Sequence, residues 1–235
     1  MWVDPFIDEM QILCLKSFVA NKVEFHLYTY NKIENVPVGV TIKDANEILS
    51  KSLIFKDNKN SYATFSDWFR IKLLYDIGGW WVDCDVLFVK RFNFRAKYVF
   101  ATESFYSDGN LEIRICNAVL KMPKKSSIGK KVLNKIDDKL SQTTGDKIKW
   151  TEIGAGFLKE EIIDEYLEQY IVIPEVFCPN AWNTFSQVSK NNEMKFDDRT
   201  YAVHLWNKMW EWNKINPLNE SVKGSLLDDA KNNYG

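Results

Sequence analysis

Apolar and polar positions alternate along the chain with two different periods, which predict helices and strands in turn. Residues 7–22 and 62–77 carry apolar side chains at helical spacing, the second segment almost all round the helix. Residues 23–30 are rich in aromatic side chains and predict a strand, and residues 38–42 predict a second, short one. The alternation indicates an α/β fold. Further strands are expected at 98–102, 113–119 and 171–173, and further helices after Asp44 and at 127–140 and 157–169.

A nearly continuous apolar run at residues 80–89 predicts a central strand that is covered on both faces. Only Asp83 and Asp85 interrupt it. In an extended strand, residues two apart point to the same side, so the two carboxylates would share one face while Cys84 turns away. Two half-buried carboxylates repel one another unless a cation, a shared proton or a basic neighbour compensates their charge.

Three kinds of chemistry fit this pair of aspartates. A divalent ion such as Mg²⁺ or Mn²⁺ binds through one or two carboxylates together with substrate phosphates. A phosphatase with an aspartyl nucleophile also has Asp-x-Asp after an apolar strand, but the threonine expected four residues after Asp83 is replaced by Leu87. The pair could also cap a strand end or form salt bridges with lysines. The spacing alone leaves all three open.

The helix expected at residues 62–77 carries two charged residues on one face. Asp67 and Arg70 are three residues apart, so they could form a local ion pair or both point into a site. Gly78 or Gly79 is expected to end this helix in the left-handed conformation that glycine tolerates best.

The length and composition indicate a globular protein with one domain. The chain has 235 residues, of which 46% are hydrophobic and 14% aromatic. We expect residues 1–215 to form this domain and residues 216–235 to be a peripheral tail or helix. The 31 basic and 32 acidic residues give a net charge of −1, so nothing attracts nucleic acid or an anionic membrane in general. Any partner must therefore be recognised by a local site and not by the net charge of the protein.

The N-terminus and the cysteines bear on localisation. The first residues lack the pattern of a signal peptide, and no apolar run reaches the roughly 18–20 residues that span a bilayer. The four cysteines are far apart without a CxxC pair, which suggests neither a zinc site nor a disulfide framework. We therefore expect a cytoplasmic protein, which could act at the inner face of the membrane.

The run FSDWFRIKLLYDIGGWWVDCDV, residues 65–86, resembles the signature of the DXD-containing sugar transferases of glycosyltransferase family thirty-two. The resemblance extends upstream through residues 17–49 and downstream to residues 201–210, and the large clostridial glucosylating toxins are more distantly similar. It implies a GT-A fold, a Rossmann-like domain with a mostly parallel central sheet flanked by helices. Such a sheet binds ligands at the carboxyl ends of its strands, where the pattern also places the aspartate pair.

The resemblance also implies roles for individual residues. Asp85 would bind the metal directly, while Asp83 would contact the donor ribose or sugar and support the metal. Asp67 and Arg70 would hold the donor sugar, which makes these four the catalytic set. His204 matches the position of a C-terminal polar group near the metal and diphosphate, and neutral imidazole is a sound additional ligand. A histidine packed beneath nearby tryptophans is the alternative.

Two further donor-site residues follow from the same similarity. In the relatives a tryptophan at the end of the first strand stacks on the uracil ring, and Trp2 matches it. Nearly all of that strand is absent here, so either the protein dispenses with it or its start is truncated, and core packing of Trp2 stays open. Asn117 and Glu103 fall where the family approaches the donor or acceptor sugar, although each could be a strand-end hydrogen-bonding residue.

Other residues support weaker hypotheses. His26 is expected to be structural, and core packing is the simpler interpretation of the tryptophans at 206, 210 and 212, with an acceptor platform or a membrane-surface edge as alternatives. Glu152 and the small residues 154–156 resemble a family loop only in part, and an acceptor-side role is open. A lysine-rich stretch could attract an anionic lipid-linked acceptor, or be a solvated helix face. It consists of Lys121, Lys124, Lys125, Lys130, Lys131 and Lys135.

The function expected from the sequence is a metal-dependent, retaining hexosyltransferase. It would use Mn²⁺ or Mg²⁺ and a UDP-sugar donor, and it would act on a glycan or lipid-linked saccharide acceptor. A nucleotide-sugar or glycan-binding subunit without turnover is one alternative, and a metal-dependent phosphohydrolase is another.

Overall fold

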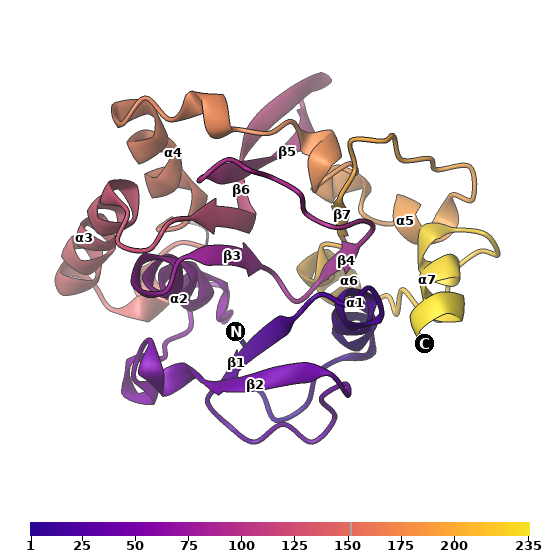
Figure 1. Cartoon of the computed structure of the whole chain (residues 1–235), viewed down its shortest axis with the longest axis horizontal. Helices are drawn as coiled ribbons and strands as arrows, with labels where there is room; N and C mark the ends of the chain where they lie inside the picture. The colour runs from indigo at the N-terminus through magenta and orange to yellow at the C-terminus, as the bar shows by residue number, and fades with distance from the viewer. Residues whose placement is uncertain (151) are drawn as a thin grey trace.

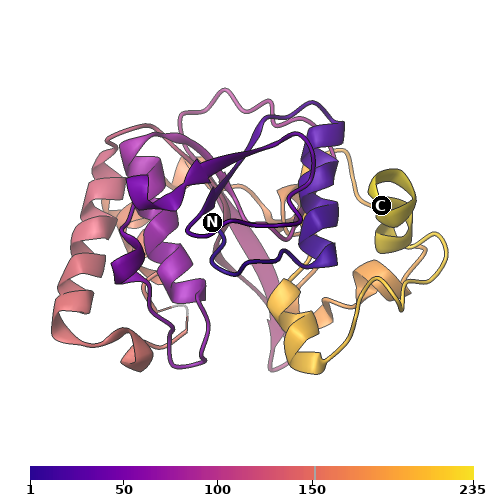
Figure 2. The same ribbon diagram turned by 90° about the horizontal axis from the view of Figure 1, so that it is seen from below.

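Two groups of helices flank the strands in the computed structural model, which describes residues 1–150 and 152–235. Figures 1 and 2 show α2, α3 and α4 on one side and α1, α5, α6 and α7 on the other. The helices are α1 Glu9–Ala20, α2 Ala63–Asp76, α3 Ser127–Gln142, α4 Ala155–Asp164, α5 Gln187–Lys190, α6 Asn207–Asn213 and α7 Leu226–Tyr234.

The strands form three small sheets. A parallel pair, a three-stranded antiparallel sheet in the order β3-β6-β5 and an antiparallel pair, β4 with β7, lie between the helices. The strands are β1 Phe25–Thr29, β2 Val40–Asp44, β3 Gly79–Val82, β4 Val86–Phe88, β5 Val99–Ser107, β6 Asn110–Met122 and β7 Ala202–His204. The α/β class is as expected, but the expectation of a mostly parallel central sheet is wrong, since only β1 and β2 pair in parallel among these strands.

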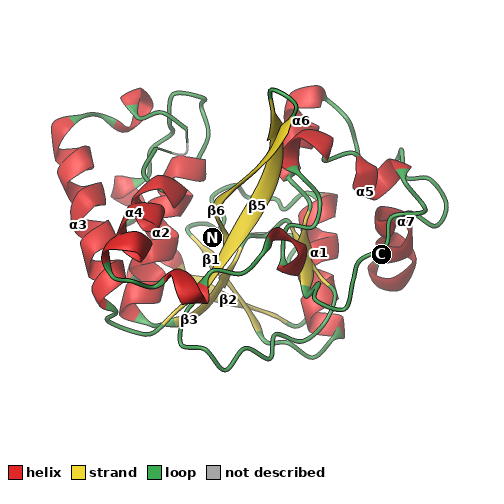
Figure 3. Cartoon of the chain, turned by 90° about the horizontal axis from the view of Figure 1, so that it is seen from above, coloured by secondary structure: helices red, strands yellow, loops and turns green. Residues whose placement is uncertain are grey.

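A long hairpin accounts for much of this difference. The two short strands expected at 98–102 and 113–119 are parts of β5 and β6, which continue to a tight turn and appear together in Figure 3. Asp108 and Gly109 occupy this turn with φ of 49° and 80°, as a two-residue hairpin turn requires. The hairpin places β6 between β3 and β5, and both pairings are antiparallel.

The strand expected at residues 80–89 is interrupted at its middle. β3 ends at Val82 and β4 begins at Val86, and Asp83 to Asp85 form a turn between them. The two halves pair with different strands, β3 with β6 and β4 with β7. The prediction that both aspartates stand on one face of a continuous strand is therefore wrong, because a change of partner strand needs a bend.

Helix α2 agrees closely with its prediction. Phe65, Phe69 and Leu74 are fully buried in the largest core cluster, and both glycines that follow the helix have positive φ. Gly78 has a positive φ of 79°, which favours glycine, and an added Cβ would lie 2.6 Å from the backbone nitrogen of Lys124. This position therefore needs glycine for both backbone conformation and space.

Other local predictions were less accurate. Asp44 caps a single 3₁₀ turn, Ala45–Glu47, rather than a longer helix. Residues 171–173 contribute only an isolated bridge between Phe100 and Ile171. The helix expected at 157–169 begins at Ala155 and ends at Asp164.

The C-terminal segment ends in helix α7, which packs through Leu227 and Ala230 into a core cluster that also contains Leu13 of α1 and Trp210. The division into residues 1–215 and 216–235 stays a prediction. Within the described part of the chain, every helix is too short or too polar to cross a bilayer.

Candidate functional site

A cavity of about 460 Å³ opens where the turn between β3 and β4 meets the chain start, α2 and α6. This volume lies in the range of small-molecule sites. Of the residues predicted for the site, the cavity wall includes Trp2, Arg70, Asp83 and Asp85. The fold thus brings together side chains from distant parts of the sequence.

Arg70 is the centre of a buried charge network. Its guanidinium lies 3.3 Å from the carboxylate of Asp67, one helical turn away, and 3.3 Å from that of Asp83. It also donates a hydrogen bond of 2.5 Å to the backbone oxygen of Asn117. Asp67 and Arg70 are both almost completely buried. They form the ion pair that their spacing allows, and Arg70 also reaches the cavity.

Burial and charge act in opposite directions on these groups. Burial raises the pKa of Asp67 to about 6, although the charge of Arg70 and a hydrogen bond from the Asn117 amide (2.7 Å) both oppose the rise. Burial lowers the pKa of Arg70, but Asp83 and Asp67 outweigh it and leave this pKa above its usual value. Arg70 therefore stays a cation at neutral pH. The Asp67 carboxyl, with its pKa of about 6, titrates slightly below neutral pH.

The raised pKa of Asp67 predicts a pH-dependent cost to stability. The native state holds the Asp67 proton more tightly than the unfolded state between the ordinary pKa of 3.8 and about 6, so the contribution of this group to stability falls as pH rises through that window. In Asp67→Asn this contribution to the pH dependence of stability is lost. The free energy of unfolding of the wild type relative to the variant should fall by up to about 3 kcal/mol between pH 3.5 and 7.

Urea unfolding of both proteins at half-unit pH steps measures this difference. Asp108→Asn at the exposed hairpin turn is the matched control. A wild-type minus variant difference that does not change with pH would show that Asp67 is not held in a charge-disfavouring environment.

Asp83 has one further neighbour, Trp81, that the sequence reasoning missed. The indole N–H of Trp81 donates to the carboxylate at 2.7 Å, and the same ring lies under Arg70, with the guanidinium carbon 5.1 Å from the ring centroid. This cation–π contact fixes Arg70 from its apolar side. The only sequence signal is that Trp81 lies two residues before Asp83 in the strand.

Asp85 is held by β7 and by the start of α6. The imidazole Nε2 of His204 lies 3.3 Å from its carboxylate, and the backbone N–H of Asn207 donates to it at 2.8 Å. Burial raises the pKa of Asp85, but His204 and these hydrogen bonds bring it below its usual value. Burial lowers the pKa of His204, and Asp85 reverses this and raises it well above the usual range. The Trp206 ring packs on the imidazole, with centroids 3.9 Å apart.

Asp83, Asp85 and His204 could hold a divalent cation. Their ligand atoms all lie within 4.8 Å of one another. The Nε2 atom of His204 faces the Asp85 carboxylate at 3.3 Å, so it is the ring nitrogen that would bind such a cation. Two carboxylates and an imidazole are donors that a divalent ion such as Mn²⁺ accepts. The residues present therefore fit the metal that the sequence resemblance implies.

A pair of buried thiols lies on the other side of the imidazole. The sulfur atoms of Cys116 and Cys178 are 3.8 Å apart, and both lie within 4.8 Å of a His204 nitrogen. The hydrogen bond with Cys178, together with burial, raises the pKa of Cys116 well above its usual value. Because the thiolate is the metal-binding form, these protonated thiols are poorer ligands at neutral pH than the two carboxylates.

The remaining predicted site residues are divided between the cavity and the core. Trp2 lines the cavity, and its indole N–H donates to the oxygen of Phe6 at 2.8 Å. Asn117 is not part of the cavity wall, and its side-chain amide donates a hydrogen bond to the Asp67 carboxylate. Glu103 lies outside the cavity wall, buried in the hairpin and paired with Arg114 at 2.5 Å.

The three C-terminal tryptophans have different environments. Trp210 is fully buried in the core, as the simpler interpretation expected. Trp206 packs on His204, and Trp212 is 43% exposed and contacts Trp150. The core prediction therefore holds fully only for Trp210.

The lysine-rich stretch is largely neutralised within the fold. Lys125 pairs with Asp76, and two lysines of α3 pair with acidic residues of α4. Lys121 donates to backbone oxygens at positions 94 and 96. Of these two α3 lysines, Lys131 pairs with Glu165, directly after the end of α4, and Lys135 pairs with Glu161.

Gly154 allows close packing beside Asp67 and Asn117. A Cβ added at Gly154 would lie 2.3 Å from a carboxylate oxygen of Asp67 and 2.7 Å from the amide nitrogen of Asn117. At Gly156, two residues later, an added Cβ meets nothing within 4 Å. The sequence drew attention to this loop but not to its contact with Asp67.

Gly154→Ala is expected to push Asp67 and Asn117 out of place and to lower donor turnover about 100-fold, since a misplacement of about 1 Å can have that effect. Gly156→Ala is the matched control and should stay within about twofold. The two variants can be compared by kcat/KM with the best nucleotide-sugar donor. Equal activity of the two variants would contradict a role for the position of Asp67.

Comparison with known proteins agrees with this geometry. The family model described as "Glycosyltransferase sugar-binding region containing DXD motif" matches residues 8–104, which include α2 and the aspartate turn. No protein with curated annotation matches the sequence. Residues 8–104 are therefore similar to a DXD-type glycosyltransferase sugar-binding region.

One solved structure is similar in fold to most of the chain. It is described as "PaToxG Glycosyltransferase", and the superposition has a TM-score of 0.51 with 15% sequence identity over 71% of this chain and 68% of that chain. At this identity the likeness concerns the fold alone.

Proposed function

We propose that the chain is a metal-dependent, retaining hexosyltransferase that uses a UDP-sugar and transfers the hexose to a hydroxyl of a glycan or lipid-linked saccharide. One observation carries this proposal. Arg70, Asp83 and Asp85 line one cavity of about 460 Å³, and His204 lies directly behind Asp85. The DXD sugar-binding region that matches this segment supports the same reaction class.

The cavity has suitable groups for each part of the donor. Trp2 offers an aromatic face for the base, and Lys56 also lines the wall, where it complements the negative charge of a diphosphate. Asp83, which contacts Trp81 and Arg70, would contact the ribose or sugar. We assign Mn²⁺ or Mg²⁺ to Asp83, Asp85 and His204.

Arg70 would stabilise the charge that develops on the leaving diphosphate. Its guanidinium is already fixed by Asp67, Asp83 and the Asn117 oxygen, so little reorganisation is needed during the reaction. A bound divalent cation would supply Lewis-acid stabilisation of the same charge. Asp67 is held between Arg70 and Asn117 and is therefore better suited to positioning than to nucleophilic attack.

Retention of configuration needs no protein nucleophile in this proposal. The bond from the anomeric carbon to the diphosphate oxygen breaks, and the bond to the acceptor oxygen forms on the same face. The acceptor hydroxyl gives its proton to the leaving phosphate oxygen. We place this reaction in the cytoplasm, or at the inner face of the membrane when the acceptor is lipid-linked.

A panel of nucleotide sugars tests this function. UDP release from UDP-hexoses is measured with Mn²⁺ and with EDTA, with GDP-hexoses as the control for base selectivity. Release that requires both uridine and metal supports the proposal. Release of phosphate from a generic phosphoester without any sugar would favour a phosphohydrolase, and UDP binding without turnover across donors and acceptors would favour a binding subunit.

A further inference from the structure

Two of the four cysteines lie together beside the imidazole of His204, although they are 62 residues apart in the sequence. Cys116 is in β6, and Cys178 follows the 3₁₀ turn Pro174–Val176. Their sulfur atoms are 3.8 Å apart, and both lie within 4.8 Å of a His204 nitrogen. The sequence spacing suggested no zinc site, because only the folded chain brings these three side chains together.

The two nitrogen atoms of the His204 ring have different surroundings. Nε2 lies 3.3 Å from the Asp85 carboxylate. Nδ1 is buried and has no hydrogen-bond partner among the described residues. A histidine that binds a metal through one nitrogen usually donates the N–H of the other to a carboxylate, which fixes the ring. Asp85 can accept such a bond from Nε2, so Nδ1 is the nitrogen left for an ion held by the two thiols.

The separation of the two sulfur atoms suits a tetrahedral ion. Zn–S bonds are about 2.3 Å long, so two of them span 3.8 Å at an S–Zn–S angle of about 110°, close to the tetrahedral value. A thiol that coordinates zinc loses its proton even where its free pKa is high. Mn²⁺ instead prefers oxygen ligands such as the carboxylates of Asp83 and Asp85. The thiol pair and the aspartate pair therefore favour different ions.

The surroundings of the thiols favour a complex without net charge. Cys116 and Cys178 belong to a buried core cluster that also contains Val86, Ala118 and Phe177. Burial of a free charge in such apolar surroundings is costly. Two thiolates neutralise the charge of Zn²⁺, so the complex avoids most of this cost.

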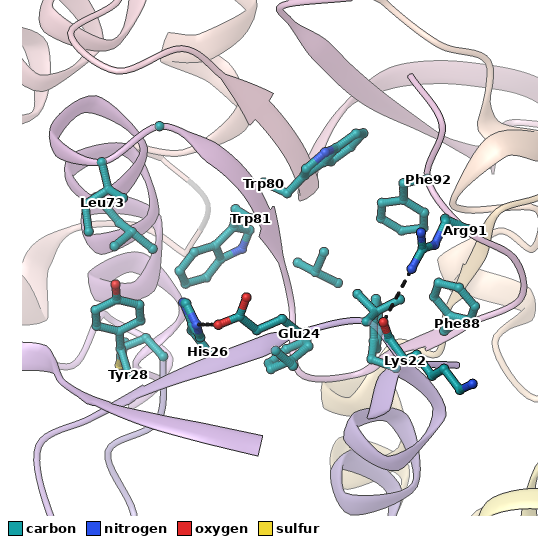
Figure 4. Close-up of a pocket in the computed structure, with 17 residues that line it drawn as sticks. Lys22, Glu24, His26, Tyr28, Leu73, Trp80, Trp81, Phe88, Arg91 and Phe92 are labelled. Atoms are coloured by element: carbon teal, nitrogen blue, oxygen red, sulfur yellow. Dashed lines mark hydrogen bonds and ion pairs between the residues drawn. The ribbon is translucent and has the colours of Figure 1, made fainter. Parts of the chain in front are cut away.

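Aromatic rings separate the thiols from a second cavity, which has a volume of about 510 Å³ and lies between β1 and β3. Figure 4 shows Trp80 and Phe92 on its wall. Both rings pack on Phe177, at centroid distances of 6.2 and 5.2 Å, and Phe177 directly precedes Cys178. Neither Cys116 nor Cys178 is part of the cavity wall, and these rings shield the thiols from its solvent.

We propose that Cys116, Cys178 and the Nδ1 atom of His204 form a second metal site, which binds Zn²⁺. Binding displaces one proton from each thiol and the proton on Nδ1 to solvent, and one bond to zinc forms at each of these three atoms. Three protein ligands are sufficient, since Zn²⁺ takes water as its fourth ligand in many sites.

Zinc at this site would withdraw His204 from the candidate catalytic metal. A neutral imidazole has one acceptor nitrogen, so a ring bound to zinc through Nδ1 keeps its proton on Nε2 and donates it to Asp85. Nε2 then has no lone pair for Mn²⁺, and zinc inhibits the Mn²⁺-dependent reaction. This consequence rests on the proposed function, whereas the thiol site itself does not.

Titration of Cd²⁺ into the reduced full chain tests the site directly, because Cd²⁺ replaces Zn²⁺ at thiolates and its bonds to sulfur absorb in the ultraviolet. One equivalent should saturate this absorption, and Zn²⁺ should remove it. Cys116→Ser and Cys178→Ser should each weaken Cd²⁺ binding at least about 100-fold, since loss of an outer partner of a ligand already lowers affinity about 10- to 100-fold. Cys14→Ser changes a third buried thiol outside the cluster and is the matched control.

The absorption decides the inference whether or not the protein transfers sugar. Its absence in the folded wild type, or equal Cd²⁺ affinity in wild type and both cluster variants, would overturn the inference, and thermal melting shows which proteins are folded. If UDP release is found, Zn²⁺ should lower it at least about 10-fold more in the wild type than in Cys178→Ser. Equal inhibition of the two would show that zinc acts at the aspartates and not through the thiols.

Discussion

Asp85→Asn is expected to lower Mn²⁺-dependent turnover of the UDP-sugar donor at least about 100-fold. The change keeps the shape of the side chain and its contact with the Asn207 N–H, but it removes the charge that faces His204 and the metal. Loss of an outer partner of a metal ligand lowers metal affinity or activity about 10- to 100-fold, and loss of a direct ligand should exceed this. The measurement is kcat/KM as a function of Mn²⁺ concentration.

Asp108→Asn is the matched control, since this aspartate is exposed in the β5–β6 turn and Asn tolerates its positive φ. Its activity should equal that of the wild type. Thermal melting of both variants separates loss of function from loss of fold. Unchanged turnover and unchanged metal dependence in Asp85→Asn would show that this carboxylate does not hold the metal.

Arg70→Ala is expected to lower the free energy of unfolding by about 3–5 kcal/mol. The guanidinium is only 4% exposed and lies between the carboxylates of Asp67 and Asp83. Removal of one member of a buried charge network leaves an uncompensated buried charge, which accounts for most of this loss. Urea unfolding at pH 7 measures it.

Two further variants make this prediction specific. Arg199→Ala breaks an exposed pair with Asp197 and should leave the unfolding midpoint nearly unchanged, because exposed ion pairs contribute little. Asp67→Asn added to Arg70→Ala should recover part of the loss, since the variant then buries one negative charge fewer. Wild-type stability for Arg70→Ala, or no recovery in the double variant, would contradict the network.

The parts of the fold with local signals were predicted well. Residues 62–77 are apolar nearly all round, and the structure has helix α2 there, followed by two glycines with positive φ. The ion pair between Asp67 and Arg70 is one of the two arrangements that their spacing allowed. These features depend on residues within one helical turn of each other.

The parts that depend on distant partners were not predicted. The run at 80–89 is apolar throughout, and nothing in it shows that β3 pairs with β6 while β4 pairs with β7. The Asp108–Gly109 pair is a sequence signal for a hairpin turn. If it had been used, the sequence would have predicted an antiparallel sheet instead of a parallel one. Contacts such as Gly154 with Asp67 have no local signature, because only the folded chain brings them together.

The placement of His204 beside Asp85 came from family resemblance, since the AVHLW run has no metal-binding spacing of its own. The structure brings the Nε2 atom of the imidazole within 3.3 Å of the Asp85 carboxylate, and the ligand atoms of Asp83, Asp85 and His204 all lie within 4.8 Å of one another. Resemblance and geometry therefore support this metal site by separate routes.

Calorimetric titration of UDP into the full chain, with Mn²⁺ and then with EDTA, tests the central claim most directly. The account predicts binding of UDP that needs Mn²⁺ and is much weaker for GDP. Binding of UDP that is equally strong in EDTA, or no binding of either nucleotide to the folded protein, would contradict a metal-dependent UDP-sugar site at Asp83, Asp85 and His204.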